Sequence, residues 1–409
     1  MTTTINNEHK KLNVPNLRFP EFSGEWEKCK VSDLLDFYST NSLSWDKLEY
    51  GTDAIQNLHY GLIHVGLPTM IDLSNAKLPN ITNGNTPKNY ELCREGDIAF
   101  ADASEDTNEV AKAVEFYNLN GKDVICGLHT IHGRDNKQKT VVGYKGYAFS
   151  STTFHHQIRR LAQGTKIYSI NSKNFSECYI GIPSKEEQKK IATLLQLIDE
   201  RIATQNKIIE DLKKLKCAII EKLYSEIQGK EYSFGQLFEV ANERNKQMQY
   251  SNILSASQEK GMVNRDDLNL DIQFERSNIN TYKIVRAGDY VIHLRSFQGG
   301  FAFSDKQGVC SPAYTILRPN YLLEYGYLSY YFTSNRFIKS LIIVTYGIRD
   351  GRSINVEEWL NMKTILPPKE QQRKILSVLH SFDAKIKNEE NILNDYVKQK
   401  QYLLSQMFV

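Results

Sequence analysis

One short segment of the sequence has side chains that could bind a metal ion. Cys126, His129 and His132 lie within residues 126–132, and thiolate and imidazole are groups that zinc prefers. A fourth ligand is not evident nearby, and the related stretch CSPAYTILRP at residues 310–319 has no histidine. We therefore predict no metal site there.

The sequence lacks the motifs of enzymes that act on DNA or nucleotides. An adenine methyltransferase needs a cofactor-binding glycine loop and an Asn/Asp-Pro-Pro-aromatic box, whereas Pro367-Pro368 is followed by Lys-Glu. No GxxxxGK[ST] phosphate loop occurs, and we find no carboxylate cluster typical of a nuclease. The adjacent His155 and His156 are predicted to face DNA or solvent. We predict no catalytic residues.

Basic residues are concentrated in one stretch. Residues 134–166 contain seven Lys or Arg and one acid, Asp135, with aromatic residues between them. Lys and Arg neutralise phosphates, and Arg and Gln read base edges. The alternative is that these are ordinary solvated loop charges. The candidate DNA contacts are Lys137, Lys139, Lys145, Arg159, Arg160 and Lys166, and in the second half of the chain Arg295, Gln298, Arg349 and Arg352.

Length and composition set the limits within which these residues must be positioned. The 409 residues suggest two or three domains, and 41% hydrophobic with 24% charged residues is typical of a globular protein. The longest aliphatic run, residues 341–344, is far too short to cross a bilayer. The N-terminus is polar, and six scattered cysteines form no CxxC pair. We predict a cytoplasmic protein with reduced thiols. With 51 basic against 48 acidic residues, a nucleic acid would be met by local patches.

An internal repeat organises the chain. Residues 182–225 and 366–409 align without a gap at an offset of 184, with identical pairs such as Gln188/Gln372 and Asp199/Asp383. Apolar residues recur in each copy at alternating spacings of three and four, which predicts a long helix with a coiled-coil seam. The alternative is that each helix packs on its own globular domain. The predicted seam residues are Ile191, Leu195, Ile198, Ile202, Ile209 and Leu212 in the first copy, and Ile375, Leu379, Phe382, Ile386, Leu393 and Tyr396 in the second.

Two globular stretches alternate with these helices. They are weakly related, because NYELCREGDIAFADAS (89–104) matches TYKIVRAGDYVIHLRS (281–296) around a Gly-Asp turn. We predict an N-terminal entry segment (1–25), a first globular domain (26–181), a first spacer helix (182–230), a second globular domain (231–365) and a second spacer helix (366–409). The fold class is α+β: two globular domains of mixed α/β content, separated by two long antiparallel coiled-coil helices in a pseudo-two-fold repeat. Two similar but non-identical readers on a spacer resemble a dimeric DNA-binding protein made in one chain.

Several segments together resemble a known family. IPSKEEQKKIATLLQLIDERI (182–202) and LPPKEQQRKILSVLHSFDAKI (366–386) are similar to the Pro-Pro-x-x-Glu-Gln boxes that open the spacer helices of type I restriction-modification specificity subunits. PNLRFPEFSGEWEKCKVSDL (15–34) resembles the N-terminal entry of that family, with FGQLFEV (234–240) a fainter copy of its last part. Ser184 departs from the box, and we expect little consequence because one proline suffices for the turn.

The resemblance implies a non-catalytic role in host defence. Each globular domain would be a target-recognition domain for one half of a bipartite site in double-stranded DNA. The spacer helices would set the gap and hold two modification subunits, which methylate adenine at N6, with restriction subunits completing the complex. S-adenosylmethionine, ATP and Mg would be bound by these partners and no cofactor by this chain, which has no membrane role. A stand-alone DNA-binding protein and a coiled-coil scaffold without nucleic acid remain the alternatives.

Overall fold

The contacts of the chain divide it into two compact units. The structure, a computed structural model, describes residues 13–257, 260–267, 276–293, 300–346 and 353–409. Unit 1 comprises Met1–Asn206 with Asn391–Val409, and unit 2 comprises Lys207–Glu390. Each unit therefore contains one globular domain, called domain 1 or domain 2 below, and part of both long helices. The boundaries between the units fall inside the two predicted spacer helices.

Unit 1 is a mixed α/β domain built on part of the two long helices. Its strands are β1 (Glu27–Lys30), β2 (Asp36–Tyr38), β3 (Leu48–Glu49), β4 (Gln56–Leu58), β5 (Met70–Asp72), β6 (Asn80–Ile81), β7 (Ile98–Ala101), β8 (Ala103–Ser104), β9 (Ala113–Asn118), β10 (Val124–Cys126), β11 (Thr130–Arg134), β12 (Tyr168–Ser169) and β13 (Tyr179–Ile182). Its helices are α1 (Val31–Leu34), the 3-10 turn η1 (Trp45–Lys47), α2 (Tyr60–Val65), α3 (Tyr144–Phe149), α4 (Thr152–Leu161), α5 (Ser172–Ser176) and the start of α6 (Lys185–Ser225).

Unit 2 has the same kind of content. Its strands are β14 (Lys230–Ser233), β15 (Phe238–Ala241), β16 (Leu254–Ser257), β17 (Gly261–Asn264), β18 (Lys283–Val285), β19 (Tyr290–Ile292), β20 (Phe301–Phe303), β21 (Gly308–Cys310), β22 (Thr315–Pro319), β23 (Thr345–Tyr346), β24 (Ser353–Ile354) and β25 (Lys363–Leu366). Its helices are α7 (Phe234–Leu237), α8 (Tyr327–Tyr331), α9 (Asn335–Ser340), α10 (Val356–Asn361) and the start of α11 (Lys369–Gln406), with 3-10 turns η2 (Arg265–Asp267), η3 (Arg276–Thr281) and η4 (Leu341–Val344).

Each domain contains its own central antiparallel sheet, and the two sheets have the same strand order. Domain 1 orders four of its strands β2-β11-β7-β9, and domain 2 orders its counterparts β15-β22-β19-β20. The registers correspond as well, since Ala99 pairs with His132 in domain 1 and Val291 pairs with Ile316 in domain 2. Each domain is closed where its first and last strands pair, β1 with β13 and β14 with β25. The weak sequence relation therefore reflects one fold used twice.

The predicted box at the start of each spacer helix has a structural role. Gln188 is fully buried; its Oε1 accepts from the Val141 backbone N–H at 2.9 Å, and its Nε2 donates to the Pro183 carbonyl at 2.9 Å. Gln372 does the same with Glu324 and Pro367, at 2.8 and 3.0 Å. One glutamine thus fixes the helix start to a loop of its own domain. The Ser184 hydroxyl, which replaces a proline, accepts from the Glu187 backbone N–H at 3.3 Å and so caps the helix.

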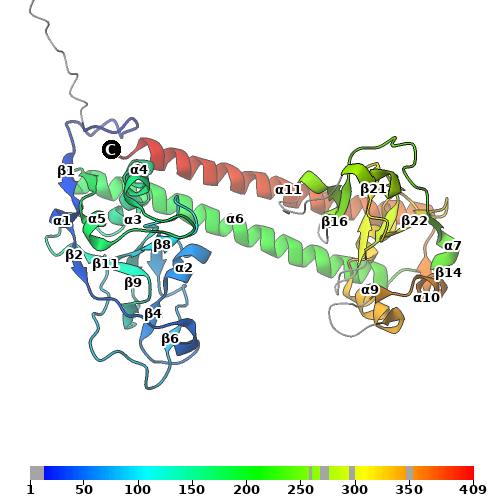
Figure 1. Ribbon diagram of the computed structural model, residues 1–409, viewed down its shortest axis with the longest axis horizontal. Helices are drawn as coiled ribbons and strands as arrows, with labels where there is room; N and C mark the ends of the chain where they lie inside the picture. The colour runs from blue at the N-terminus through cyan, green and yellow to red at the C-terminus, as the bar shows by residue number, and fades with distance from the viewer. Residues whose placement is uncertain (1–12, 258–259, 268–275, 294–299, 347–352) are drawn as a thin grey trace, which may run out of the picture. The chain divides into compact units, whose positions relative to one another are not determined.

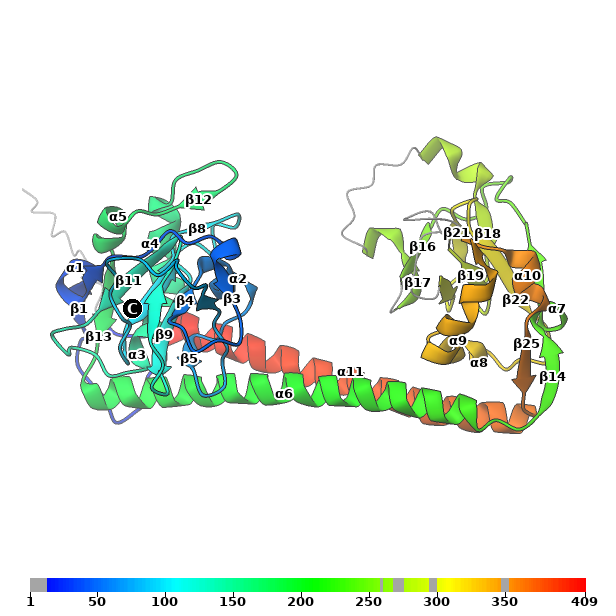
Figure 2. The ribbon, with the colours of Figure 1, turned by 90° about the horizontal axis from the view of Figure 1, so that it is seen from below.

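The two long helices run antiparallel within each unit. Figure 1 and Figure 2 show α6 and α11 lying along each other within each unit. In unit 1 Asp199 of α6 pairs with Lys400 of α11 at 2.6 Å, and in unit 2 Lys213 of α6 pairs with Glu390 of α11 at 3.2 Å. Burial falls on the predicted seam: Ile191, Leu195, Ile198, Ile209, Ile375, Leu379 and Ile386 are buried, and Ile202, Leu212, Phe382, Leu393 and Tyr396 are half-buried. The predicted antiparallel spacer is confirmed.

The alternative of helices that pack on their own domains is correct for the first turns. Ile191, Leu195 and Ile198 belong to the core of domain 1, and Ile375 and Leu379 to the core of domain 2. Each helix therefore starts as part of a globular core and continues as part of a helix pair. The core of domain 2 is centred on the fully buried Trp359, which stacks on Phe234 with ring centroids 4.4 Å apart.

Candidate nucleic-acid interface

Five of the six predicted DNA contacts of domain 1 have side chains at or near its surface. Lys137 is exposed and donates to the Asp33 carbonyl at 2.8 Å, while the half-exposed Lys139 pairs with Glu27 at 2.8 Å. Both lie in the loop between β11 and α3. Arg159, Arg160 and Lys166 are exposed at and beyond the end of α4. Surface cations in these positions can meet phosphates, because their present partners are weak, solvated contacts.

Lys145 is not available to DNA, contrary to the sequence-based prediction. It lies on α3 at 2% exposure, and its ammonium pairs with Glu115 of β9 at 2.9 Å. Glu115 is completely buried and also accepts from the backbone N–H groups of Gly143 and Gly146 at 3.0 and 2.7 Å. Lys145 neutralises the Glu115 carboxylate, which would otherwise be a buried charge without a partner. In domain 2 the corresponding residues, Leu328 and Phe303, are apolar.

Lys145→Met is expected to destabilise the protein by about 3–5 kcal/mol, because it leaves the Glu115 carboxylate buried without its cation. Lys166→Ala, on the exposed surface, should change the free energy of unfolding by less than about 0.5 kcal/mol. Urea titration of both variants measures the difference. Unchanged stability together with lost DNA binding in Lys145→Met would instead restore Lys145 as a DNA contact.

Arg134, the first residue of the basic stretch, is likewise bound inside domain 1. Its Nε and Nη2 donate to the Asp97 carboxylate, both at 2.8 Å, and its Nη1 donates to Glu91 at 2.6 Å. Burial raises the pKa of Asp97, but hydrogen bonds from His132 and Arg134 outweigh burial and hold that pKa below its usual range. Domain 2 keeps the pair as Arg318 and Asp289, at 3.1 Å. This ion pair belongs to the fold of both domains.

The histidines of domain 1 have different surroundings. His156 is exposed, as predicted, but His155 is largely covered and its Nδ1 is buried without a hydrogen-bond partner among the described residues. His129 is exposed beside Asp102, with Nδ1 and Oδ1 3.1 Å apart. Burial lowers the pKa of His155 to about 4. The negative charge of Glu109 opposes this shift, whereas the positive charges of Arg159 and Lys112 add to it. The pair is therefore one surface histidine and one neutral, packed histidine.

Acid should destabilise the protein through His155. Because the pKa is about 4 in the folded protein and about 6.5 in the unfolded chain, its contribution is complete above pH 6.5 and is lost as the pH falls toward 4. The loss amounts to about 2–3 kcal/mol. His155→Gln should flatten this part of the stability profile and His156→Gln should not, as urea titrations between pH 7 and 4 would show. Equal slopes in all three proteins would contradict this assignment.

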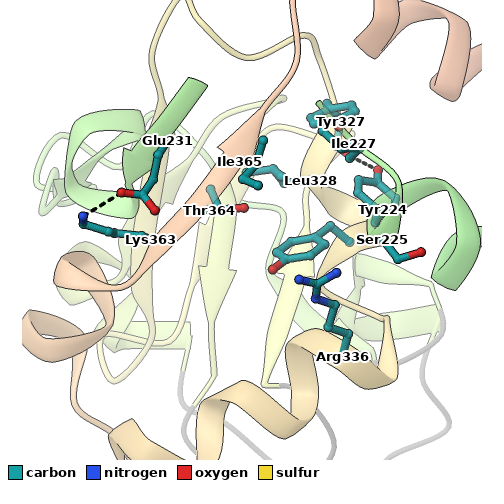
Figure 3. Close-up of a pocket in the computed structure, with 11 residues that line it drawn as sticks. Tyr224, Ser225, Ile227, Glu231, Tyr327, Leu328, Arg336, Lys363, Thr364 and Ile365 are labelled. Atoms are coloured by element: carbon teal, nitrogen blue, oxygen red, sulfur yellow. Dashed lines mark hydrogen bonds and ion pairs between the residues drawn. The ribbon is translucent and has the colours of Figure 1, made fainter. Parts of the chain in front are cut away.

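The four candidates of the second half, Arg295, Gln298, Arg349 and Arg352, lie outside the described residues. The described part of domain 2 has a surface cavity of about 250 Å³ where the end of α6 meets β14, β25 and α8 (Figure 3). The Tyr224 hydroxyl of α6 donates to the Tyr327 carbonyl at 2.5 Å, and Lys363 pairs with Glu231. Exposed Arg336 also lines this cavity, which lies at the attachment of the helix to its domain.

The structure also shows a duplicated junction that the sequence analysis missed. The Tyr147 hydroxyl of α3 donates to Asp199 of α6 at 2.9 Å, and Asp199 pairs with Lys400 of α11. In unit 2 Tyr330, Asp383 and Lys216 form the same chain of contacts. Burial, with the neighbouring carboxylate, raises the pKa of both tyrosines, so each stays a hydrogen-bond donor. The repeat itself carried the signal, since Asp199/Asp383 and Lys216/Lys400 are matching positions.

No helix in the described part of the chain is long and apolar enough to span a membrane.

Comparison with known proteins identifies related chains. The sequence matches the type I restriction modification DNA specificity domain over residues 75–214 and 229–395. It is 22% identical over 419 residues to a putative type I restriction enzyme MjaX specificity subunit of Methanocaldococcus jannaschii, covering 96% of this chain and 95% of that protein.

Solved structures share the fold. One chain, from a study of complex assembly and conformational transition of the type I restriction-modification system, has a TM-score of 0.60 at 14% identity, over 93% of this chain and 96% of that one. The S subunit of a type I system from M. genitalium has a TM-score of 0.50 at 14% identity, over 97% of this chain and 99% of that one.

Proposed function

This chain belongs to the type I restriction-modification DNA specificity family, and from that premise we propose that each of its two domains reads one half of an asymmetric, bipartite site in double-stranded DNA. The chain acts as a non-catalytic specificity subunit. The observation that supports one half-site for each domain is the repeated sheet, which has the order β2-β11-β7-β9 in domain 1 and β15-β22-β19-β20 in domain 2. Matching positions of the two sheets have different side chains. One scaffold used twice with different residues suits two different half-sites.

The spacer helices are proposed to set the gap between the half-sites and to bind two modification subunits. Both helices expose large apolar side chains within the described structure: Leu197, Ile208 and Leu215 on α6, and Val378, Val397 and Tyr402 on α11. In the proposed complex the modification subunits would cover these apolar side chains. The modification subunits would bring S-adenosylmethionine, and restriction subunits would bring ATP and Mg, in a cytoplasmic complex. A stand-alone DNA-binding protein of this architecture is the second candidate.

The test is single-molecule methylation sequencing of DNA from a methylation-free host that expresses this chain with its cognate modification subunit. Hosts that express either protein alone are the controls. A bipartite N6-methyladenine motif that needs both proteins supports the proposal and gives both half-sites. If a soluble, assembled pair produces no new motif while the chain alone binds DNA specifically, the stand-alone alternative is favoured.

The exposed cations of domain 1 should act through phosphates. Lys137→Ala, Arg160→Ala and Lys166→Ala are each expected to weaken DNA binding and to reduce the slope of log affinity against log salt by about 1. Lys214→Ala, on the spacer helix and paired with Glu210, is the matched control and should leave the slope unchanged. Fluorescence anisotropy over a salt series measures these slopes. A slope that is the same in all four variants would remove this surface from the DNA interface.

A further inference from the structure

Three buried side chains of domain 1 lie close together, one on its central sheet and two on neighbouring segments. Cys93 precedes β7, Cys126 ends β10 and His132 lies in β11; they are 5%, 1% and 0% exposed. Their ligand atoms all lie within 4.8 Å of one another. Sequence spacing had drawn attention to Cys126, His129 and His132, but His129 is exposed and turned to Asp102. Cys93, thirty-three residues before Cys126, takes its place.

The separation of the two thiols fits a shared metal ion. Their sulfur atoms are 3.6 Å apart. Two thiolates bound tetrahedrally to zinc at about 2.3 Å have their sulfurs about 3.8 Å apart, whereas a disulfide requires about 2.05 Å. The pair is therefore spaced for joint coordination without a covalent bond.

The imidazole has a carboxylate partner on one ring nitrogen, as metal-bound histidines commonly do. Its Nε2 donates to the Asp97 carboxylate at 2.8 Å, and its Nδ1 is buried without a hydrogen-bond partner among the described residues. Asp97 is itself fixed by Arg134 and by the backbone N–H of Arg94 at 2.9 Å. A carboxylate behind the ring sets the tautomer, so that Nδ1 keeps the lone pair that a metal needs.

Domain 2 shows that the fold does not require these groups. The registers of the matching strands place Val285 at the position of Cys93, Cys310 at that of Cys126 and Ile316 at that of His132. All three are buried in an apolar cluster, while the Asp289–Arg318 pair is kept. Domain 1 thus buries a second thiol and an imidazole where apolar packing suffices. Among the described residues the imidazole Nδ1 has no hydrogen-bond partner, which is costly unless it gains one.

We propose that Cys93, Cys126 and His132 bind one zinc ion in domain 1. Two thiolates balance the charge of Zn²⁺, a neutral imidazole adds none, and binding releases the two thiol protons to solvent. Both oxygens of Asp97 already accept hydrogen bonds, so a water molecule would be the fourth ligand. The ion would join the segment before β7 to β10 and β11. Its role is structural and does not depend on DNA recognition.

Metal analysis of the untagged full-length chain, purified without chelator and incubated with zinc chloride before desalting, tests the assignment. We expect one zinc ion per chain, lost in Cys93→Ser and kept in Cys310→Ser and Cys178→Ser. Because serine at a buried site can impair folding, the double variant Cys93→Val, His132→Ile, which copies domain 2, is the decisive one. It should fold, bind no zinc and keep its melting temperature when a strong chelator is added.

Cobalt replaces zinc as a spectroscopic probe. The wild-type chain loaded with Co²⁺ should show thiolate-to-cobalt charge-transfer absorption, which the double variant lacks. A folded wild-type chain that takes up no metal would overturn the proposal. Metal retained by the double variant, or a Cys93–Cys126 disulfide found by mass spectrometry of unreduced peptides from freshly lysed cells, would overturn it equally.

Discussion

Seven residues added to each spacer helix should lengthen the unread gap of the DNA site by about 3 base pairs. Insertion between Asn206 and Lys207 and between Glu390 and Asn391 falls where the two units divide. A heptad adds about 10.5 Å of helix and keeps the phase of a 3.5-residue seam. At 3.4 Å per base pair this corresponds to about 3 base pairs.

The contacts between the helices explain why both insertions are needed. Asp199–Lys400 and Asp383–Lys216 lie on opposite sides of the insertion points. Seven residues in α6 alone would put one of these pairs out of register, so this single insertion is the matched control and should abolish specific methylation. Methylation sequencing reads the gap directly. An unchanged gap in an active double-insertion complex would refute the role of the helices as a ruler.

Replacing residues 231–365 with the second domain of another family member should change one half-site and leave the other intact. The domain begins and ends at one strand pair, β14 with β25, and its DNA-reading residues are not shared with domain 1. The same sequencing assay shows both halves of the new motif. Changes in both halves would contradict modular reading.

The graft succeeds only if the junction with the helices is preserved. Tyr330 meets Asp383, and Tyr224 of α6 packs on Tyr327 with ring centroids 5.5 Å apart. A donor domain with tyrosines at the positions of Tyr327 and Tyr330 is therefore the appropriate choice. The reciprocal exchange of residues 26–181 is the control and should change the other half-site.

The sequence alone determined the plan of the molecule. An offset of 184 and a 3.5-residue period are properties of the chain itself, so the repeat, the two long helices and their antiparallel seam could be predicted, and α6 and α11 begin within three residues of the predicted limits of 182 and 366. The family resemblance followed from the same boxes, whose buried glutamines connect each helix to its domain. A helix depends mainly on residues that are close together in the sequence, and this is why both long helices could be predicted from the sequence.

Only the tertiary structure decided which polar groups are available. Lys145 and Arg134 carry the same formal charge as Lys137, yet sheet pairing places Glu115 and Asp97 against them and removes both from the surface. Cys93 could not be joined to Cys126 and His132 by spacing, because a bridge between strands brings it there. The sequence sets the charge and ligand chemistry of each side chain. Whether that charge meets a phosphate, a carboxylate or a metal depends on long-range contacts that only the fold creates.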